Sequence, residues 1–180
     1  EFEDSGYDVK YKVVHAVEFG VPQKRDRVII VGFRKNLNVE FDFPVAVVDS
    51  PEKYVPLVKV IDSDVDDKYF FSQKAVDGMM RNRESMNKGR AQNIDEPCNT
   101  VGAHLAKVSL NSTDPVLMVD DKYRRFTPRE VARIQSFPES FKLTESEYAQ
   151  YKALGNAIPP VMFWYIMRSV KNSLDSEKKY

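Results

Sequence analysis

Two strand-like runs occupy the first part of the chain. Apolar and polar side chains alternate from Tyr7 to Val17, and Arg27–Phe33 contains the unbroken apolar run Val28–Val31. Alternation suits a strand with one buried face, whereas a continuous apolar run suits a strand buried on both faces of a larger sheet. Gly20 and Pro22 mark the loop between the two runs. The pattern predicts a strand pair whose cover must come from other residues.

Helix signals follow further along the chain. Ser72 can cap a run of apolar residues at near-helical spacing. Residues 127–130, Thr-Pro-Arg-Glu, form a capping box with proline at the first helical position, which predicts a short helix to about Ser136. A second capping box at 144–147, Thr-Glu-Ser-Glu, predicts a helix that Gly155 ends in a left-handed conformation.

A last helix is predicted from Val161 to about Leu174, after the pair Pro159-Pro160. Its first seven residues, Val-Met-Phe-Trp-Tyr-Ile-Met, are all apolar. A helix that is apolar on nearly every face is normally buried on nearly every face. A chain of 180 residues is short for burying all faces of such a helix. The apolar run therefore predicts that the helix packs against a partner domain.

Composition and charge limit the possible functions. With 42% hydrophobic and 30% charged residues the chain is typical of a globular protein. Basic and acidic residues each number 27, so a nucleic-acid surface must be a local patch and not a property of the whole chain. The single cysteine, Cys98, excludes an internal disulfide and a multi-cysteine zinc site, and it favours a cytoplasmic protein.

Other targeting and metal signals are lacking. No apolar run is long enough to cross a bilayer, so no membrane partner is expected. His15 and His104 are lone imidazoles, and no metal site is predicted. The chain begins without Met or a signal pattern, which favours a piece of a longer protein or of a complex.

Gln23, Arg25 and Arg27 alternate at period two. On an extended chain they project to one side, where they suit a site for an anion and a polar base edge. The alternative is a solvated strand face with ion pairs to Asp26 or Glu18.

A second polar cluster lies between residues 122 and 135, with five basic residues against the single acid Glu130. A capped helix N-terminus flanked by arginines can hold a phosphate. The alternative is structural, with Arg133 paired to Glu130 and Arg125 tying segments together, and we expect a scaffold role for Arg133 and Gln135.

Three stretches together resemble the C-terminal third of the cytosine-5 DNA methyltransferases. Residues 20–28, GVPQKRDRV, match the Gln-x-Arg-x-Arg motif of that family as it enters a strand. Residues 124–138, RRFTPREVARIQSFP, are similar to its ninth motif, and residues 154–160, LGNAIPP, to its tenth. The three occur in the order of the family, with a variable region between the first two, and together they span nearly the whole chain.

The resemblance implies an α+β fold: a small mixed DNA-recognition domain, flanked by a strand pair and a C-terminal helix that belong to a missing Rossmann-like α/β methyltransferase domain. The implied boundaries are 1–34 for the end of the large domain, 35–142 for the recognition domain and 143–180 for the returning helices. The implied activity is transfer of a methyl group from S-adenosylmethionine to C5 of a flipped cytosine in double-stranded DNA, in a bacterial restriction–modification system. The alternatives are the smaller subunit of a split methyltransferase and a non-catalytic DNA-binding module.

The resemblance also implies residue roles. Arg27 reaches the flipped cytosine, with Arg25 and Gln23 in support, and Asn156 with Ala157 lines the methyl-donor pocket unless Gly155-Asn156 is only a helix cap. The DNA-contacting residues would be Arg83, Arg90, Thr100, Val101, Arg124, Arg125 and Arg129.

The nucleophile of the family is not among these residues. The chain has no Phe-x-Gly-x-Gly cofactor loop, no Pro-Cys-Gln loop and no Glu-Asn-Val triplet. Residues 96–99, Glu-Pro-Cys-Asn, are superficially similar to the nucleophile loop, but they follow the Gln-x-Arg-x-Arg motif, whereas the family nucleophile precedes it. We therefore expect Cys98 to be structural and the catalytic cysteine to lie in an N-terminal methyltransferase domain or subunit.

Overall fold

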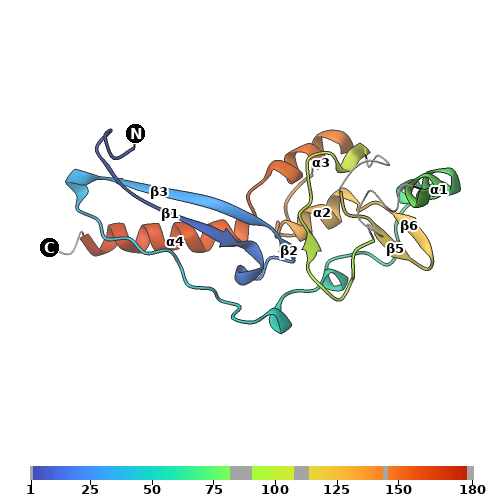
Figure 1. The fold of residues 1–180 in the computed structure, drawn as a ribbon, viewed down its shortest axis with the longest axis horizontal. Helices are drawn as coiled ribbons and strands as arrows, with labels where there is room; N and C mark the ends of the chain where they lie inside the picture. The colour runs from blue at the N-terminus through green and yellow to red at the C-terminus, as the bar shows by residue number, and fades with distance from the viewer. Residues whose placement is uncertain (1, 82–90, 108–113, 144–145, 178–180) are drawn as a thin grey trace.

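A computed structural model describes residues 2–81, 91–107, 114–143 and 146–177. The molecule is elongated (Figure 1). A hairpin and a long helix form one end, and short strands and three helices form the other.

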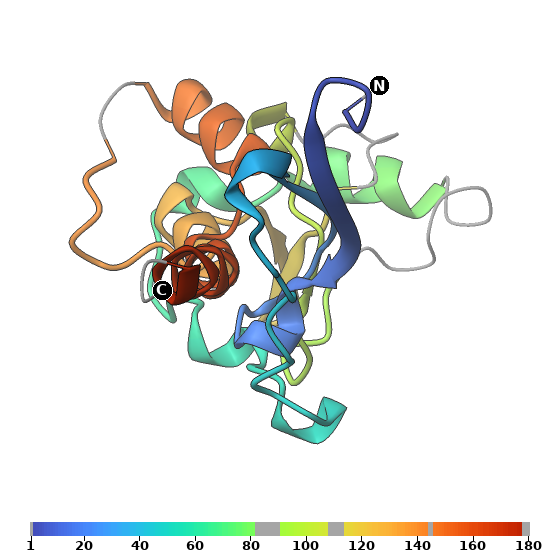
Figure 2. The ribbon, with the colours of Figure 1, turned by 90° about the vertical axis from the view of Figure 1, so that its left-hand side faces the viewer.

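The hairpin pairs strand β1 (Tyr7–His15) with strand β3 (Asp26–Arg34) in antiparallel register, from Tyr7 opposite Arg34 to His15 opposite Asp26. Helix α4 (Pro160–Glu177) lies along one face of this hairpin, and Figure 2 shows it end-on beside the strands. The core between them contains Val14, Ala16, Phe19, Val21, Met162 and Ile166. The predicted strand pair is therefore confirmed.

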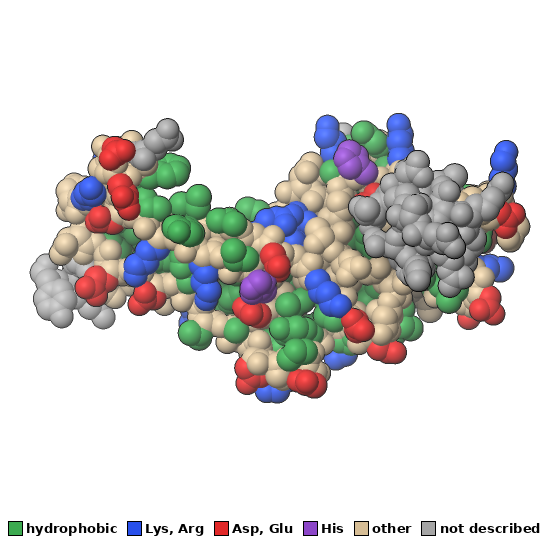
Figure 3. Space-filling view, viewed as in Figure 1, with side chains coloured by type: hydrophobic (Ala, Val, Ile, Leu, Met, Phe, Trp, Pro, Cys, Tyr) green, Lys and Arg blue, Asp and Glu red, His purple; other side chains and the backbone are tan. Residues whose placement is uncertain are grey.

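The other face of the hairpin is open. Side chains alternate across a strand, so residues facing away from α4 share one surface. On that surface Tyr11 is 77% exposed, Val28 62% and Ile30 55%. Figure 3 shows hydrophobic side chains gathered along the hairpin. The apolar run of β3 is thus covered on one face by α4 and left bare on the other.

The second end is built around its own core. Strand β5 (Leu117–Val119) pairs with β6 (Lys122–Arg124), and strand β2 (Gln23–Lys24) pairs in parallel with β4 (Cys98–Asn99). Helices α2 (Pro128–Ile134) and α3 (Glu147–Asn156) pack against each other beside them. The buried residues of this core are Leu57, Cys98, Val101, Leu105, Leu117, Phe126, Val131, Ala132, Ile134, Tyr151 and Leu154.

Local signals set most helix starts. Thr127 and Glu130 form the predicted capping box of α2, which ends two residues before the expected Ser136. Helix α1 (Gln73–Arg81) starts directly after Ser72, as expected, while its predicted continuation lies outside the described residues. Ser146 caps α3, and the predicted cap at Thr144 also lies outside the described residues.

The prediction that Gly155 adopts a left-handed conformation is wrong. Gly155 lies inside α3, and it is not among the described glycines with positive φ, which are Gly6 and Gly20. Its role is close packing instead, because a Cβ on Gly155 would lie 2.2 Å from the carbonyl oxygen of Gly102.

Helix α4 begins at Pro160, close to the predicted start.

Helix α4 is less buried than its sequence predicts. Met162 and Ile166 are buried against the hairpin, but Phe163, Trp164 and Met167 are between 41% and 53% exposed. Within the described residues, no helix combines the length and the apolar character needed to cross a membrane.

Candidate nucleic-acid and cofactor surface

Gln23 enters the protein interior at the point where the two ends of the molecule meet. Gly20, with φ of 78°, turns the chain after the short helical turn Ala16–Phe19 and delivers β2 beside β4. The Gln23 side chain is fully buried. Its Oε1 accepts the Val101 N–H at 2.9 Å, and its Nε2 donates to Gln135 Oε1 at 3.0 Å.

Arg25 is buried beside Gln23 and contacts two segments. Its guanidinium donates to the carbonyl oxygen of Val101 at 3.2 Å and to those of Gly155 and Ala157 at 3.0 Å each. Desolvation, followed by the charge of Arg27, lowers the pKa of Arg25 to about 10, so the group stays charged at neutral pH. Its Nε is buried with no hydrogen-bond partner among the described residues.

Arg27 differs from the other two members of the motif. Its side chain is half-buried, and its guanidinium donates to the Asp26 carbonyl oxygen at 2.6 Å. Burial alternates along the motif, because Gln23 and Arg25 are buried whereas Lys24 and Asp26 are exposed. This alternation agrees with the expected projection to one side, and that side faces the protein interior at Gln23 and Arg25. The alternative of a solvated face fails for the same two residues. Arg27 alone in this motif remains partly open to a ligand.

The segment Thr100–Val101 is fixed by these contacts. Val101 is buried, and its backbone N–H and carbonyl are both held by the motif. This burial contradicts a DNA contact by the Val101 side chain. Thr100 is exposed, and its hydroxyl donates to the Lys24 carbonyl oxygen at 2.7 Å. Thr100 therefore keeps a defined position at the surface.

Arg124 forms a buried ion pair and is not available to DNA. Its guanidinium makes two hydrogen bonds to the Glu130 carboxylate, at 2.7 and 2.8 Å, with side-chain exposures of 1% and 0%. It also donates to the carbonyl oxygens of Asp62 and Arg125. The geometry contradicts the predicted DNA contact, because both groups are satisfied inside the protein.

The remaining arginines of the cluster have partners within the chain. Arg125 pairs with Glu147 at 3.2 Å with a quarter of its side chain exposed, as the tying role predicts. Arg129 is half-buried and donates to the carbonyl oxygen of Phe141 at 2.9 Å. Both retain some exposed surface, so a phosphate contact stays a proposal for them. The predicted residues Arg83 and Arg90 lie outside the described part of the chain.

Arg133 does not pair with Glu130, contrary to the structural alternative. It bridges Glu139, at 2.6 Å, and Asp62, at 2.7 Å. The hydrogen bond to Glu139 is the largest cause that raises the pKa of Arg133 above its ordinary value. This bridge joins α2 to segments on both sides of it.

Asn156 is the last residue of α3, and Ala157 follows it as the C-cap, at the start of the turn to α4. Asn156 is exposed and Ala157 is half-buried. The turn is anchored from inside, because Arg25 holds the carbonyls of Gly155 and Ala157 and Gln135 holds that of Leu154 at 2.6 Å. An exposed amide on a fixed turn can serve as one contact of a cofactor pocket, but this turn alone cannot enclose a cofactor.

Cys98 is fully buried in the second core. Desolvation raises the pKa of its thiol far above the ordinary range. A nucleophilic cysteine needs an accessible thiolate, so Cys98 does not have the properties of the family nucleophile.

Gln135 is the connecting residue whose importance the sequence does not reveal. It stands directly after α2, is fully buried and links Gln23 to Leu154. The sequence predicts a scaffold role for Gln135 but not its partners, which lie 112 and 19 residues away. In the sequence, the signal for Gln135 is its place within residues 124–138, the stretch similar to the ninth motif.

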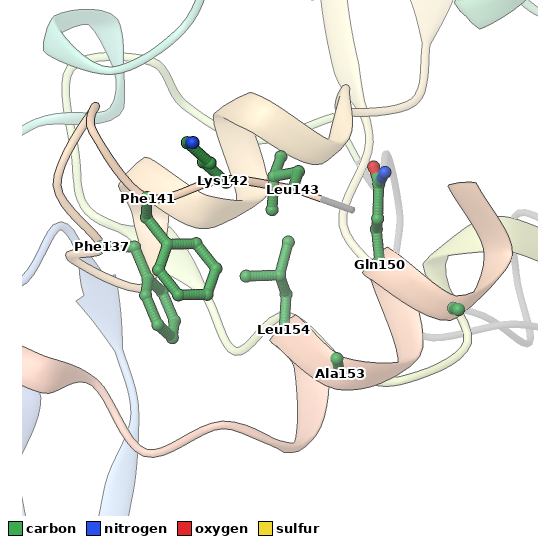
Figure 4. A pocket seen from close by; sticks show the side chains of 8 residues that line it. Phe137, Phe141, Lys142, Leu143, Gln150, Ala153 and Leu154 are labelled. Carbon is green, nitrogen blue, oxygen red and sulfur yellow. The ribbon is translucent and has the colours of Figure 1, made fainter. Parts of the chain in front are cut away.

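Two apolar hollows in the described part of the chain are lined by residues other than the predicted site residues. One, of about 180 Å³, lies between α3 and the segment that precedes it, and Figure 4 shows Phe137, Phe141, Leu143 and Leu154 around it. The other, of about 380 Å³, lies on the bare face of the hairpin and is lined by Phe2, Tyr7, Val9, Ile30 and Gly32.

Solved structures identify the class of fold. The chain superposes on a Dnmt2 methyltransferase from S. pombe with a TM-score of 0.75 at 17% identity, covering 97% of this chain and 60% of that one. It superposes on the Entamoeba histolytica methyltransferase EhMeth with a TM-score of 0.71 at 16% identity, covering 99% of this chain and 57% of that one. The mixed α/β fold is thus that of part of a methyltransferase.

Sequence comparison shows the family. Residues 1–172 match the family described as C-5 cytosine-specific DNA methylase, and the chain belongs to it. It is 32% identical over 204 residues to the Type II methyltransferase M.FnuDI of Fusobacterium nucleatum, covering 99% of this chain and 59% of the relative. It is 30% identical over 185 residues to M.AplI of Arthrospira platensis, covering 98% of this chain and 51% of the relative. The chain therefore spans between half and three fifths of these relatives.

Proposed function

We propose that this chain is the C-terminal segment of a DNA (cytosine-5)-methyltransferase of a bacterial restriction–modification system. It would carry the target-recognition domain, at 35–142, and helices that return to the large domain, at 143–180. The observation that carries the proposal is the common anchoring of three surface residues. Thr100, Arg27 and Asn156 are presented by segments that converge on one buried polar network.

The bare surface of the hairpin supports a second domain as partner. The open face of β1 and β3 is apolar and hollowed, and helix α4 adds a partly exposed apolar strip of Phe163, Trp164 and Met167. Exposed apolar patches of this kind mark interaction surfaces. Residues 1–34 pack with α4 in one core, so both would belong to the domain that carries the cofactor loop and the nucleophile.

Members of this family use S-adenosylmethionine, which supplies an electrophilic methyl group when bound. In this chain Asn156 and Ala157 would contact it, and their exposure on an anchored turn fits a peripheral contact. The rest of the pocket would come from the large domain. The nucleophilic cysteine would come from there too, because Cys98 is buried and its thiol is held neutral.

Double-stranded DNA would lie against Thr100 and the exposed parts of Arg125 and Arg129. These are few contacts, in keeping with a chain of zero net charge, and phosphate contacts position DNA without reading its sequence. Arg27 would face the target cytosine, since it is the member of its motif with exposed surface.

The test is Arg27→Ala in the complete methyltransferase, with Arg34→Ala as the matched control. Arg34 is an exposed arginine at the far end of the same strand, so both variants remove one positive charge from β3. Loss of a positioned donor in the reaction typically costs about 100-fold or more in rate. We expect a loss of that size in methyl transfer for Arg27→Ala, with duplex affinity changed by only a few fold.

Equal losses of transfer and duplex binding would contradict the role of Arg27. A complete protein that binds duplex DNA without methylating it, and without preference for a mismatched or flipped cytosine, would favour a non-catalytic binding module instead.

A further inference from the structure

We infer that Gln135 is a positioning residue that couples the base-facing segment at Thr100 to the donor-facing turn at Asn156. The inference rests on the proposed function and adds a residue to it. It follows from the way buried amide groups connect segments that are distant in sequence.

The connection is a continuous chain of three hydrogen bonds. The Val101 N–H donates to Gln23 Oε1 at 2.9 Å, Gln23 Nε2 donates to Gln135 Oε1 at 3.0 Å, and Gln135 Nε2 donates to the Leu154 carbonyl oxygen at 2.6 Å. Both glutamine side chains are fully buried. An unsatisfied buried amide is costly, so the four groups have to keep their relative positions.

A second link runs beside the first. Arg25 joins the carbonyl oxygen of Val101 to those of Gly155 and Ala157. The backbones also touch, since a Cβ on Gly155 would lie 2.2 Å from the Gly102 oxygen. The segment 100–102 and the turn 154–157 therefore form one block held by two polar links and a direct packing contact.

The block carries two surface residues, Thr100 and Asn156, whose positions therefore depend on each other. Thr100 directly precedes one anchored residue, and Asn156 lies between two others. A ligand that orders the turn at Asn156 therefore also restricts Thr100, and the second ligand then has less motion to remove. Binding of the methyl donor and binding of DNA should each strengthen the other by the same factor, as linkage requires.

The experiment measures that factor in the complete methyltransferase. Duplex affinity is determined with and without S-adenosylhomocysteine, and the ratio of the two dissociation constants is the coupling factor. Gln135→Met keeps the length and volume of the side chain but removes both amide hydrogen bonds. Because the Arg25 link remains, only part of the free energy of the two lost hydrogen bonds is lost from the coupling, and we expect the coupling factor to fall by about fivefold, which corresponds to about 1 kcal/mol.

Tyr151→Phe is the matched control. It removes one buried hydrogen bond from the same core, from the Tyr151 hydroxyl to the carbonyl oxygen of Phe126 at 2.5 Å, without touching either link. It should lower thermal stability, though by less than Gln135→Met, since one buried hydrogen bond is lost instead of two, and it should leave the coupling factor unchanged. If Gln135→Met does not fold, Gln135→Glu serves instead, since it keeps the acceptor for Gln23 and removes the donor to Leu154.

A coupling factor that stays within twofold of the wild type in the Gln135 variant would overturn the inference. So would a wild-type enzyme in which S-adenosylhomocysteine leaves duplex affinity unchanged, or a Tyr151→Phe variant with the same loss of coupling. Failure of the proposed function is a separate result, in which the wild-type protein neither methylates DNA nor binds S-adenosylhomocysteine.

Discussion

The buried ion pair of Arg124 and Glu130 allows a sharp distinction between scaffold and DNA contact. Glu130 accepts two hydrogen bonds from Arg124 and further ones from the backbone N–H groups of Thr127, at 2.7 Å, and Asp62, at 2.8 Å. The perturbation is Arg124→Met, which keeps a long apolar stem and removes the guanidinium.

The structure sets the expected magnitude. Arg124→Met leaves the Glu130 carboxylate buried at 0% exposure with only its backbone donors. Removing one partner of a buried ion pair typically costs about 3–5 kcal/mol, because the other charge is left without compensation. The free energy of unfolding of an ordinary domain is about 5–15 kcal/mol. This variant should therefore lose a large share of its stability.

Replacing both partners should cost less than the sum of the two single changes. Apolar replacement of a whole buried pair is often close to neutral. We therefore expect Arg124→Met combined with Glu130→Met to be more stable than the sum predicts by about 2 kcal/mol or more, since the second change removes the unpaired charge that the first one creates.

The assay is urea unfolding followed by circular dichroism, with Lys24→Met as control. Lys24 pairs with Glu96 at the surface, where the two side chains are 48% and 54% exposed, so its loss should cost less than about 1 kcal/mol. The reasoning is refuted if Arg124→Met is as mild as the control and instead reduces the salt dependence of DNA binding, which is the signature of a lost phosphate contact.

Two further predictions concern the buried thiol and the bare face. Burial raises the pKa of Cys98 above its ordinary value of 9.0, so the unfolded chain releases this proton first and the free energy of unfolding should fall as the pH rises above about 9. Cys98→Ala should flatten that fall, and thiol reagents should label Cys98 only after unfolding; rapid labelling of the native protein would contradict the burial. The isolated 180-residue chain should bind a hydrophobic dye through its open hairpin face, and Ile30→Lys should reduce the signal, whereas Val45→Lys, at an 81% exposed position elsewhere, should not. Equal dye binding by both variants would show that the dye binds a surface other than the open hairpin face.

The sequence predicted the elements that depend on neighbouring residues. The alternating run and the apolar run form the β1–β3 hairpin, Thr127 and Glu130 form a capping box, and the proline pair precedes α4. These features follow from backbone periodicity and from hydrogen bonds between residues within four positions of each other. The resemblance to the cytosine-5 DNA methyltransferases could also be recognised from the sequence, because the motifs of that family are short and contiguous.

Tertiary structure alone decided which polar side chains are internal. Gln23 and Arg25 have the spacing of a ligand-binding strand, and Arg124 stands in a basic cluster, yet all three are buried. Gly155 has the position of a helix cap but is required by contact with Gly102.

The physical reason is the separation of the partners in sequence. Arg25 is 76 residues from Val101 and 130 from Gly155, and Gln23 is 112 from Gln135. A local pattern records the polarity of a side chain and the face it shares with its neighbours. Whether that polarity meets water, DNA or a carbonyl in the interior depends on how distant segments pack, and only the folded chain determines that.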